Sequence, residues 1–334
     1  MIFLETGKRA TIKDVAKLAN VTSQTVSRAL RNSPNVAPET KRAVMRAAEQ
    51  LNYVRNSTAT ALRNGSSKII CVIYDNLLNF YFSIMTDFIQ YRLREKGYSV
   101  LTLSLRNSRL NNEAYLTAIS YNVDGIISFL EPETGLSEEV KKYRIPVLLM
   151  GRRTDEPEVD CLFADDVHGG ELAAERLIEN GCENLLCVTE PLELSCASDR
   201  VNGFLGRVEK FRKDTGADIK AGVSIYNSRA SESAAGYVCE QYDGIFCFND
   251  MLALEVISNF EECGKNPPSI IGYDNIQNEI SLPRRLTSVG CDKMVMAEKA
   301  VNMLTRRISE PSLPRQNEKL PVYLTEGVTV LQKF

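Results

Sequence analysis

The sequence has 334 residues and a formal net charge of −3, with 44% hydrophobic and 25% charged residues. These proportions are ordinary for a globular protein, and no apolar run approaches the roughly 18 residues that a membrane span needs. The N-terminus lacks a signal-peptide core, so we expect a cytoplasmic chain, and its length predicts a small module joined to a larger body.

Residues 11–31, TIKDVAKLANVTSQTVSRALR, have the pattern of two short helices joined by a tight turn. Apolar residues at helical spacing predict the first helix, and Thr11 with Asp14 three residues later has the capping-box arrangement. Asn20 tolerates the left-handed conformation of a sharp turn. Thr22 then suits the N-cap of the second helix.

The second helix turns Val26, Ala29 and Leu30 inward and leaves polar side chains outside. Glutamine and arginine read base edges with two hydrogen bonds each, whereas serine and threonine reach phosphates. The segment therefore predicts a helix-turn-helix DNA reader; the alternative is an ordinary helical hairpin with a solvated polar face. The residues expected to face outward are Ser23, Gln24, Thr25, Ser27 and Arg28.

The distribution of charge favours the DNA reader. Residues 1–65 carry 11 Lys and Arg against 4 Asp and Glu, a net charge of +7. The other 269 residues carry 29 against 39, a net charge of −10. The acidic total therefore hides a basic head, as a phosphate-binding surface requires.

A third helix is expected over about residues 38–52, with Pro38 in its first turn. Residues 55–67 then read as a polar linker with one conspicuous leucine, Leu62. A helix over about 56–64, closed by Gly65, would be marginal on its own because it is so short.

From residue 68 onward, apolar runs alternate with helical patterns, which predicts parallel sheets covered on both faces. So many strands would divide between two sheets with a cleft between lobes, and ligands bind beyond the carboxyl ends of such strands. The expected strands are 69–74, 98–104, 123–129, 145–150, 184–190, 244–248 and 269–273. The expected helices are one ending near residue 96 and others at about 167–180, 198–214, 230–241, 250–263 and 292–309.

Catalytic and metal motifs are missing from the sequence. The only histidine is His168, and the nine cysteines lack CxxC spacing, which predicts buried thiols in a reducing compartment. A redox pair of Cys182 and Cys187 is the remote alternative. Without a nucleophile–base pair, GxGxxG, P-loop or HExxH motif, we expect no enzymatic activity, metal or cofactor.

Along essentially its whole length the chain resembles the lac-repressor/galactose-repressor (LacI/GalR) family of bacterial transcription regulators. The resemblance implies a helix-turn-helix domain over 1–55, a hinge helix and linker over 56–66, and a two-lobed α/β body over 67–334, like that of periplasmic sugar-binding proteins. The motifs that carry it are TIKDVAKLANVTSQTVSRAL, LNYVRN…TALRNGSSKIICVI, VDGII, IPVLLMGR, ADDVHGGELAAERLIENG, SDRVNGF, FCFNDMLALEV, IIGYDN and LTSVG. Lobe 1 would comprise about 67–163 and 292–322, and lobe 2 about 164–291 and 323–334.

The resemblance also assigns DNA contacts. It implies that Ser23, Gln24 and Arg28 read bases in the major groove. It implies that Leu62 wedges into the minor groove and kinks the operator, although Leu62 packing against its own domain is the alternative. A hinge helix that forms only on DNA would be melted by movements of the body. The remaining expected DNA contacts are Thr11, Thr22, Thr25, Ser27, Thr40 and Asn56.

The same resemblance implies an effector site in the cleft. Planar polar groups pair with sugar hydroxyls and aromatic rings stack on the apolar face of a sugar. Arg200 has the alternative of a structural salt bridge, Asp250 that of capping its helix, and Asp165 is expected to be structural. The expected effector contacts are Asn79, Tyr81, Phe82, Arg200, Asn249 and Asp274.

Several positions depart from the family pattern. Arg55 replaces a proline before the hinge, and Asn20 replaces a turn glycine. Gly151 stands where some sugar-binding members have an aspartate, and Cys291 and Lys293 occupy stretches that elsewhere give polar and aromatic contacts. If Arg152, Arg200 and Lys293 converge, the pocket would prefer an anionic ligand such as a sugar phosphate.

We therefore expect a sequence-specific transcription regulator of the bacterial nucleoid, a repressor, whose affinity for operator DNA depends on a small molecule such as a sugar. No leucine-heptad tail is present, so a homodimer is expected. The alternatives are the same regulator gated by a protein partner, or an enzyme or free binding protein on the same fold. No motif in the sequence indicates whether the effector releases the protein from DNA or promotes its binding to DNA.

Overall fold

The computed structural model describes residues 10–54, 65–106, 109–132, 138–226 and 241–330. The chain divides into two compact units, Met1–Ser67 and Lys68–Phe334. In the described ranges, no helix is long and apolar enough to cross a membrane.

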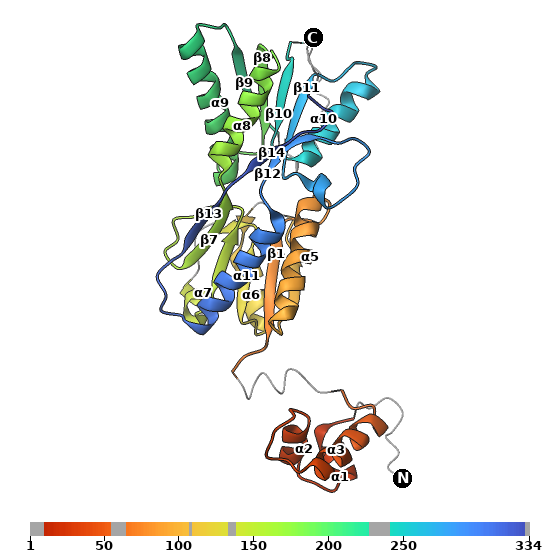
Figure 1. Ribbon diagram of the computed structural model, residues 1–334. Coiled ribbons are helices and arrows are strands. Elements are labelled where there is room, and N and C mark those ends of the chain that lie inside the picture. Colours follow the sequence, from red (N-terminus) through yellow and green to blue (C-terminus); the bar gives the residue numbers. More distant parts are fainter. Residues whose placement is uncertain (1–9, 55–64, 107–108, 133–137, 227–240, 331–334) are drawn as a thin grey trace. The chain divides into compact units, whose positions relative to one another are not determined.

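The first unit contains three helices, α1 (Ile12–Leu18), α2 (Ser23–Ala29) and α3 (Pro38–Gln50). They pack around a small core whose fully buried members include Val15 and Val26. This arrangement, drawn in red in Figure 1, confirms the two short helices and the third helix expected from the apolar spacing.

The local signals at the turns are also confirmed. The backbone N–H of Thr11 donates to the Asp14 carboxylate at 2.8 Å. The Thr22 hydroxyl accepts from the backbone N–H of Thr25 at 3.1 Å. Asn20 has a φ of 51°, the left-handed conformation that ends α1 and turns the chain into α2.

Lobe 1 of the second unit is built on a sheet of order β13-β7-β6-β4-β1-β2. Alternate residues of the central strand β1 face opposite layers, because side chains alternate along a strand. Ile70 and Val72 pack with α5 and α11, whereas Cys71 and Ile73 pack with α6. The lobe comprises β1 (Ile69–Tyr74), α5 (Phe80–Glu95), β2 (Ser99–Ser104), β3 (Arg109–Leu110), α6 (Asn112–Ser120), β4 (Gly125–Ser128), β5 (Glu131–Pro132), α7 (Glu138–Tyr143), β6 (Val147–Met150), β7 (Val159–Ala164), α11 (Lys293–Ser309) and β13 (Asn317–Leu320).

Lobe 2 repeats this plan with a sheet of order β14-β12-β11-β10-β8-β9. Helices α8 and α9 cover one face and α10 covers the other (Figure 1). The lobe comprises α8 (Asp166–Glu179), β8 (Asn184–Thr189), α9 (Ser195–Thr215), β9 (Lys220–Ile225), β10 (Gly244–Cys247), α10 (Asp250–Glu262), β11 (Ser269–Tyr273), the 3-10 turn η2 (Ile276–Asn278), β12 (Thr287–Gly290) and β14 (Tyr323–Thr325).

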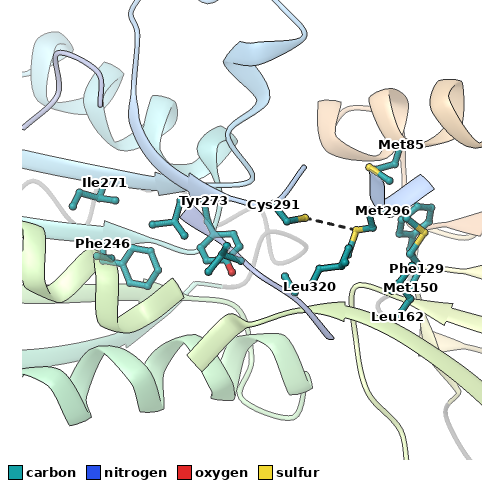
Figure 2. Close-up of a cluster of buried hydrophobic side chains, with 14 of the residues drawn as sticks. Met85, Phe129, Met150, Leu162, Phe246, Ile271, Tyr273, Cys291, Met296 and Leu320 are labelled. Atoms are coloured by element: carbon teal, nitrogen blue, oxygen red, sulfur yellow. Dashed lines mark hydrogen bonds between the residues drawn. The ribbon is translucent and has the colours of Figure 1, made fainter. Parts of the chain in front are cut away.

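The described chain passes between the two sheets at three places, after β7, after β12 and after β13. One apolar cluster continues across these crossovers. Figure 2 shows it running from Phe246 and Tyr273 in lobe 2, past Cys291 and Met296, to Phe129 in lobe 1. The lobes are therefore joined by core packing as well as by the chain.

The two main sheets are parallel, as expected, except at one edge, where β14 pairs antiparallel with β12. The apolar patterns also missed α6, α7 and several strands. Two of the missed strands, β9 and β13, lie at the edges of their sheets and are only partly buried. Such strands carry polar residues on the solvent side and lack a continuous apolar run. The expected helix at 230–241 falls, except for its last residue, outside the described residues.

Helices α8 and α9 approach each other through glycines. A Cβ on Gly203 would lie 1.9 Å from the Val167 carbonyl oxygen, and one on Gly170 would lie 2.1 Å from the Arg200 carbonyl oxygen. Gly206, on the same helix as Gly203, has no atom within 4 Å of its Cβ position. The close approach therefore needs glycine at 170 and 203 but not at 206.

We predict that Gly203→Ala lowers the free energy of unfolding by about 1–3 kcal/mol, because the added methyl overpacks the helix pair. Gly206→Ala is the matched control and should raise it by roughly 0.5–1 kcal/mol, since alanine favours a helix. Urea unfolding followed by circular dichroism measures both. Equal effects of the two substitutions would contradict the close packing at Gly203.

Candidate functional site

A cavity lies between the lobes of the second unit. It is lined by ends of strands and starts of helices from both lobes, as expected for α/β sheets. All six residues expected to contact an effector line this cavity: Asn79, Tyr81, Phe82, Arg200, Asn249 and Asp274.

Arg200 forms the floor of the cavity in lobe 2. It is buried on α9, and its Nε donates to Asp166 at 2.8 Å while its Nη1 donates to the Phe248 carbonyl at 2.5 Å. Its guanidinium carbon lies 3.4 Å from the centroid of the Tyr273 ring. Burial lowers the pKa of Arg200, but Asp166 and Tyr273 raise it further, so the charge is retained. Arg200 therefore both lines the cavity and forms the structural salt bridge that was considered as its alternative role.

Asp274 is the cavity's unpaired carboxylate. No hydrogen bond or ion pair joins its carboxylate to another described residue, and burial raises its pKa to about 6 against the opposing effects of Arg200 and Lys293. Its φ of 92° is rare for a residue other than glycine. A strained backbone and an unpaired acceptor both indicate a position kept for contact with a ligand.

Asn79 and Asn249 are helix N-caps as well as cavity residues. The Asn79 side chain accepts from the Tyr81 N–H at 3.0 Å, and the Asn249 side chain accepts from the Leu252 N–H at 2.8 Å. Each cap uses the carboxamide oxygen. The amide nitrogen of each side chain makes no hydrogen bond to a described residue. These two nitrogens are available as donors at the cavity.

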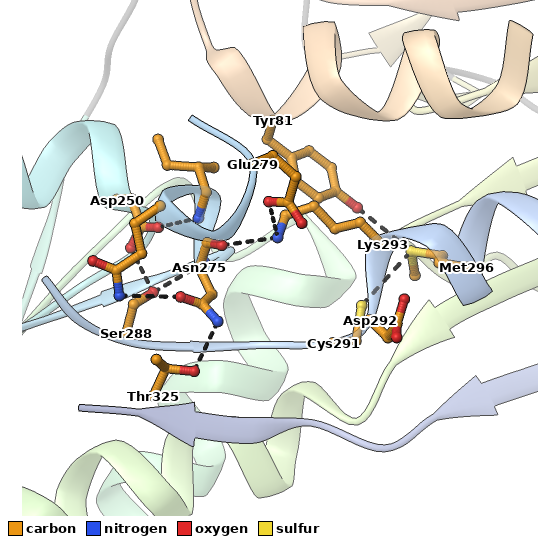
Figure 3. A network of polar contacts seen from close by, with 12 residues as sticks. Tyr81, Asp250, Asn275, Glu279, Ser288, Cys291, Asp292, Lys293, Met296 and Thr325 are labelled. Atoms are coloured by element: carbon orange, nitrogen blue, oxygen red, sulfur yellow. Dashed lines mark hydrogen bonds and ion pairs between the residues drawn. The ribbon is translucent and has the colours of Figure 1, made fainter. Parts of the chain in front are cut away.

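Asp250 is not the cap of its helix, contrary to the alternative considered above, because Asn249 holds that place. Asp250 is buried and accepts from the Ile276 N–H at 2.8 Å and from the Ser288 hydroxyl at 2.6 Å. Burial raises its pKa to about 8. As Figure 3 shows, Asp250 belongs to a polar network that fixes the turn after β11.

Aromatic rings form the lobe 1 wall. Tyr81 and Phe82 each meet Phe129 edge to face, with ring centroids 6.1 and 5.3 Å apart. The Tyr81 hydroxyl donates to the sulfur of Met296 at 3.6 Å, which fixes the ring against α11. Phe248 adds a ring from lobe 2, whose centroid lies 4.7 Å from the Arg200 guanidinium carbon.

Arg152, Arg200 and Lys293 all line the cavity, so the three cations considered above do converge there. Lys293 is buried, pairs with Glu279 at 2.8 Å and donates to the Asn275 carbonyl at 2.9 Å (Figure 3). Arg200 is paired with Asp166 as described. Arg200 and Lys293 therefore each have a carboxylate partner, which offsets the positive charge that they bring to the cavity. Arg152 and Gly151 do line the cavity, as does Cys291.

Sequence reasoning missed several cavity residues, among them Asp166, Phe248 and Tyr273. Asp165 caps α8, as expected of a structural carboxylate, whereas its neighbour Asp166 is buried and pairs with Arg200. The Asp165 side chain accepts from the His168 N–H at 3.4 Å and pairs with Lys319 at 2.6 Å. Tyr273 ends a strand, directly before Asp274, so strand-end position was the signal that could have found it.

The exposed face of α2 is narrower than expected. Gln24 and Arg28 are exposed, and Ser23 and Thr25 are partly exposed, but Ser27 is buried, which corrects its place among the outward residues. The Arg31 side chain lies back along this turn and donates to the Ser27 carbonyl at 3.1 Å. Thr11 and Thr22 are exposed and Thr40 is partly exposed. Asn56 and Leu62 lie outside the described residues, as does Arg55.

Comparison with known proteins gives a consistent result for both units. Residues 11–56 match the model for bacterial regulatory proteins of the lacI family, and residues 67–258 match that for periplasmic binding proteins and the sugar-binding domain of the LacI family. The transcriptional repressor PurR of Aliivibrio salmonicida is 30% identical over 309 residues, covering 90% of this chain and 93% of the relative.

Solved structures show the same fold. The lac repressor dimer bound to operator and the anti-inducer ONPF has a TM-score of 0.77 at 22% identity, over 97% of this chain and all of that chain. A LacI family regulator from Enterococcus faecium with bound ribose has a TM-score of 0.68 at 22% identity, over 80% of this chain and all of that chain. From its two matching units and its full-length relative, the chain belongs to the LacI family of DNA-binding transcriptional regulators.

Proposed function

We propose that this regulator is a repressor that binds operator DNA as a homodimer and that a neutral, polyhydroxylated molecule, a sugar or sugar derivative, controls its affinity for DNA. The observation that carries the proposal is the cavity's composition. It offers nitrogen donors from Arg200, Asn79 and Asn249, one carboxylate acceptor from Asp274, and aromatic walls. Vicinal hydroxyls satisfy such donors and acceptors together, while the rings cover the apolar face of a sugar.

The pairing of charges supports a neutral ligand. Asp166 neutralises Arg200 and Glu279 neutralises Lys293. An added phosphate would then lie near the Asp274 carboxylate without a free buried cation to offset it. The ribose in the Enterococcus faecium relative is a ligand of the class proposed.

The DNA side of the proposal rests on α2. Gln24 and Arg28 are exposed one helical turn apart, so both reach the same groove. Ser23, which is partly exposed, joins them in reading bases, as the family resemblance implies. Thr25 and the caps Thr11 and Thr22 supply phosphate contacts. We include Thr40, Asn56 and the minor-groove wedge of Leu62 on the basis of the family resemblance.

The homodimer has support in exposed apolar residues. Leu77, Leu78 and Phe80 lie at and before the start of α5, and Leu78 is 76% exposed. Isolated apolar residues on a surface need no explanation, but three within four positions indicate an interface. The lac repressor of the same fold was solved as a dimer on its operator.

We predict that Arg28→Ala relaxes base preference at one operator position and costs roughly 1–3 kcal/mol of specific binding, as a bidentate base contact would. In vitro selection of operator sequences followed by fluorescence anisotropy measures this. Arg31→Ala is the matched control, because the Arg31 side chain is bound to the Ser27 carbonyl. If Arg28→Ala keeps the wild-type base preference at every position, Arg28 does not read a base.

We predict that a neutral sugar binds the cavity better than its phosphorylated form. A thermal-shift panel would pair D-ribose with ribose 5-phosphate and D-glucose with glucose 6-phosphate, followed by calorimetry of whichever sugar binds. Equal or tighter binding of the phosphate would refute the neutral site.

We also predict that binding of that sugar weakens as the pH falls through about 6, the pKa of Asp274. The carboxylate is ionised above this pH and accepts strong hydrogen bonds there, whereas its protonated form below this pH accepts them weakly. Calorimetry at pH 7.5 and pH 5 compares the two states. Asp274→Asn is the control and should bind weakly at both pH values; the same pH dependence in this variant would exclude Asp274 as its source.

A further inference from the structure

Helix α9, which carries Arg200, begins without a cap of its own. Its N-cap residue is Leu194, whose side chain has no hydrogen-bond acceptor. The Glu131 carboxylate takes this place from lobe 1. It accepts from the Ser195 N–H at 3.1 Å and from the Ser195 hydroxyl at 2.8 Å, and Glu131 is only 6% exposed.

Two arginines of lobe 1 reach the same segment of lobe 2. The Arg153 N–H donates to the Ser195 hydroxyl oxygen at 2.9 Å, and its guanidinium donates to Asp199 at 2.6 Å. The Arg109 guanidinium donates to the Glu193 carbonyl at 3.5 Å. Three side chains of lobe 1 therefore reach the start of α9 and the residues just before it. A second group of polar contacts between the lobes joins Lys293 of α11 to Glu279 and to the Asn275 carbonyl.

The other helices that begin at the cavity are capped from within their own local sequence. Asp165 caps α8, Asn249 caps α10 and Asp292 caps α11. These caps are kept whatever the distance between the lobes. Only the cap of α9, among these four, depends on the lobes being close together.

A carboxylate at a helix N-terminus is stabilised by the unpaired N–H groups and by the helix dipole. Separation of the lobes would remove Glu131 from α9 and Arg153 from Asp199 at the same time. Both losses oppose opening, and neither requires a ligand.

We propose that Glu131 and Arg153 form an interlobe latch, which holds the cleft closed without ligand and keeps α9, with Arg200, in its binding position. The latch rests on the proposed function in one respect only, namely that a ligand bound in the cavity acts through closure of the lobes. A latch of this kind sets how much differential affinity a ligand needs in order to shift the protein between open and closed states.

Native cysteines report on the latch without ligand or DNA. Cys196 lies in the first turn of α9, and Cys291 lies on the crossover after β12; both line the cavity and are 5% and 7% exposed. Cys71 and Cys247 are fully buried in the sheets and report unfolding instead. The experiment measures N-ethylmaleimide labelling of each cysteine in the full chain by peptide mass spectrometry.

The variants are Glu131→Ala, which removes the cap, and Arg153→Ala, which removes the pair with Asp199 but keeps the backbone N–H. Arg207→Ala is the matched control. It breaks a 2.8 Å ion pair of α9 with Glu175, and both partners of that pair lie in lobe 2.

The latch predicts that Glu131→Ala accelerates labelling of Cys291 about tenfold, as expected for loss of a buried hydrogen bond to a charged group. Arg153→Ala should accelerate it about threefold, because the Arg153 side chain is 48% exposed and solvent weakens its pair with Asp199. Labelling of Cys71 and Cys247 should stay unchanged, and Arg207→Ala should match the wild type. Acceleration at Cys196 alone would show local fraying of α9 and overturn the latch, as would wild-type labelling of Cys291 in Arg153→Ala. If Glu131→Ala unfolds, Arg153→Ala decides by itself. Failure to find a sugar ligand would overturn the proposed function and leave this result intact.

Discussion

The buried guanidinium of Arg200 is the constraint on which the site depends. A buried charge is tolerated only where it is paired and hydrogen-bonded, and Arg200 meets this need with Asp166 of α8, the carbonyl of Phe248 after β10, and the ring of Tyr273 in β11. One side chain thereby fixes three elements at the carboxyl edge of the lobe 2 sheet. The close approach of α8 and α9 at Gly170, beside the Arg200 carbonyl, follows from the same arrangement.

The pairing of charges around Arg200 determines what chemistry remains for a ligand. Asp166 pairs with Arg200, and Lys293 pairs with Glu279. Asp250 accepts hydrogen bonds from the Ser288 hydroxyl and from the turn after β11. Asp274 stays without such a partner and faces the same cavity. These pairings are the basis of our proposal that the ligand is a neutral molecule. Tyr81 and Phe82 line the cavity from lobe 1, and Glu131 of lobe 1 contacts the start of α9, the helix that carries Arg200.

Local signals allowed much of this to be predicted from the sequence. The caps of α1 and α2 and the turn at Asn20 involve residues at most three apart, and strand-end position brought Asn79, Asn249 and Asp274 to one cavity. Partners distant in sequence were not predictable, because nothing local to either member reveals the other: Glu131 and Ser195 are 64 positions apart, and Lys293 reads as free until Glu279 is placed beside it. Burial of Ser27 was missed for a similar reason, since it depends on how α2 packs and on the path of the Arg31 side chain.

The central claim is that occupancy of the cavity controls DNA binding. Its most direct test is fluorescence anisotropy of an operator duplex, recovered by in vitro selection, titrated with the full chain with and without a saturating sugar that binds the cavity. We expect the sugar to change operator affinity about tenfold or more in the wild type, a typical coupling between two sites. It should have no effect in Asp274→Asn at the same concentration. An unchanged operator affinity in the wild type at full occupancy of the cavity would contradict the claim.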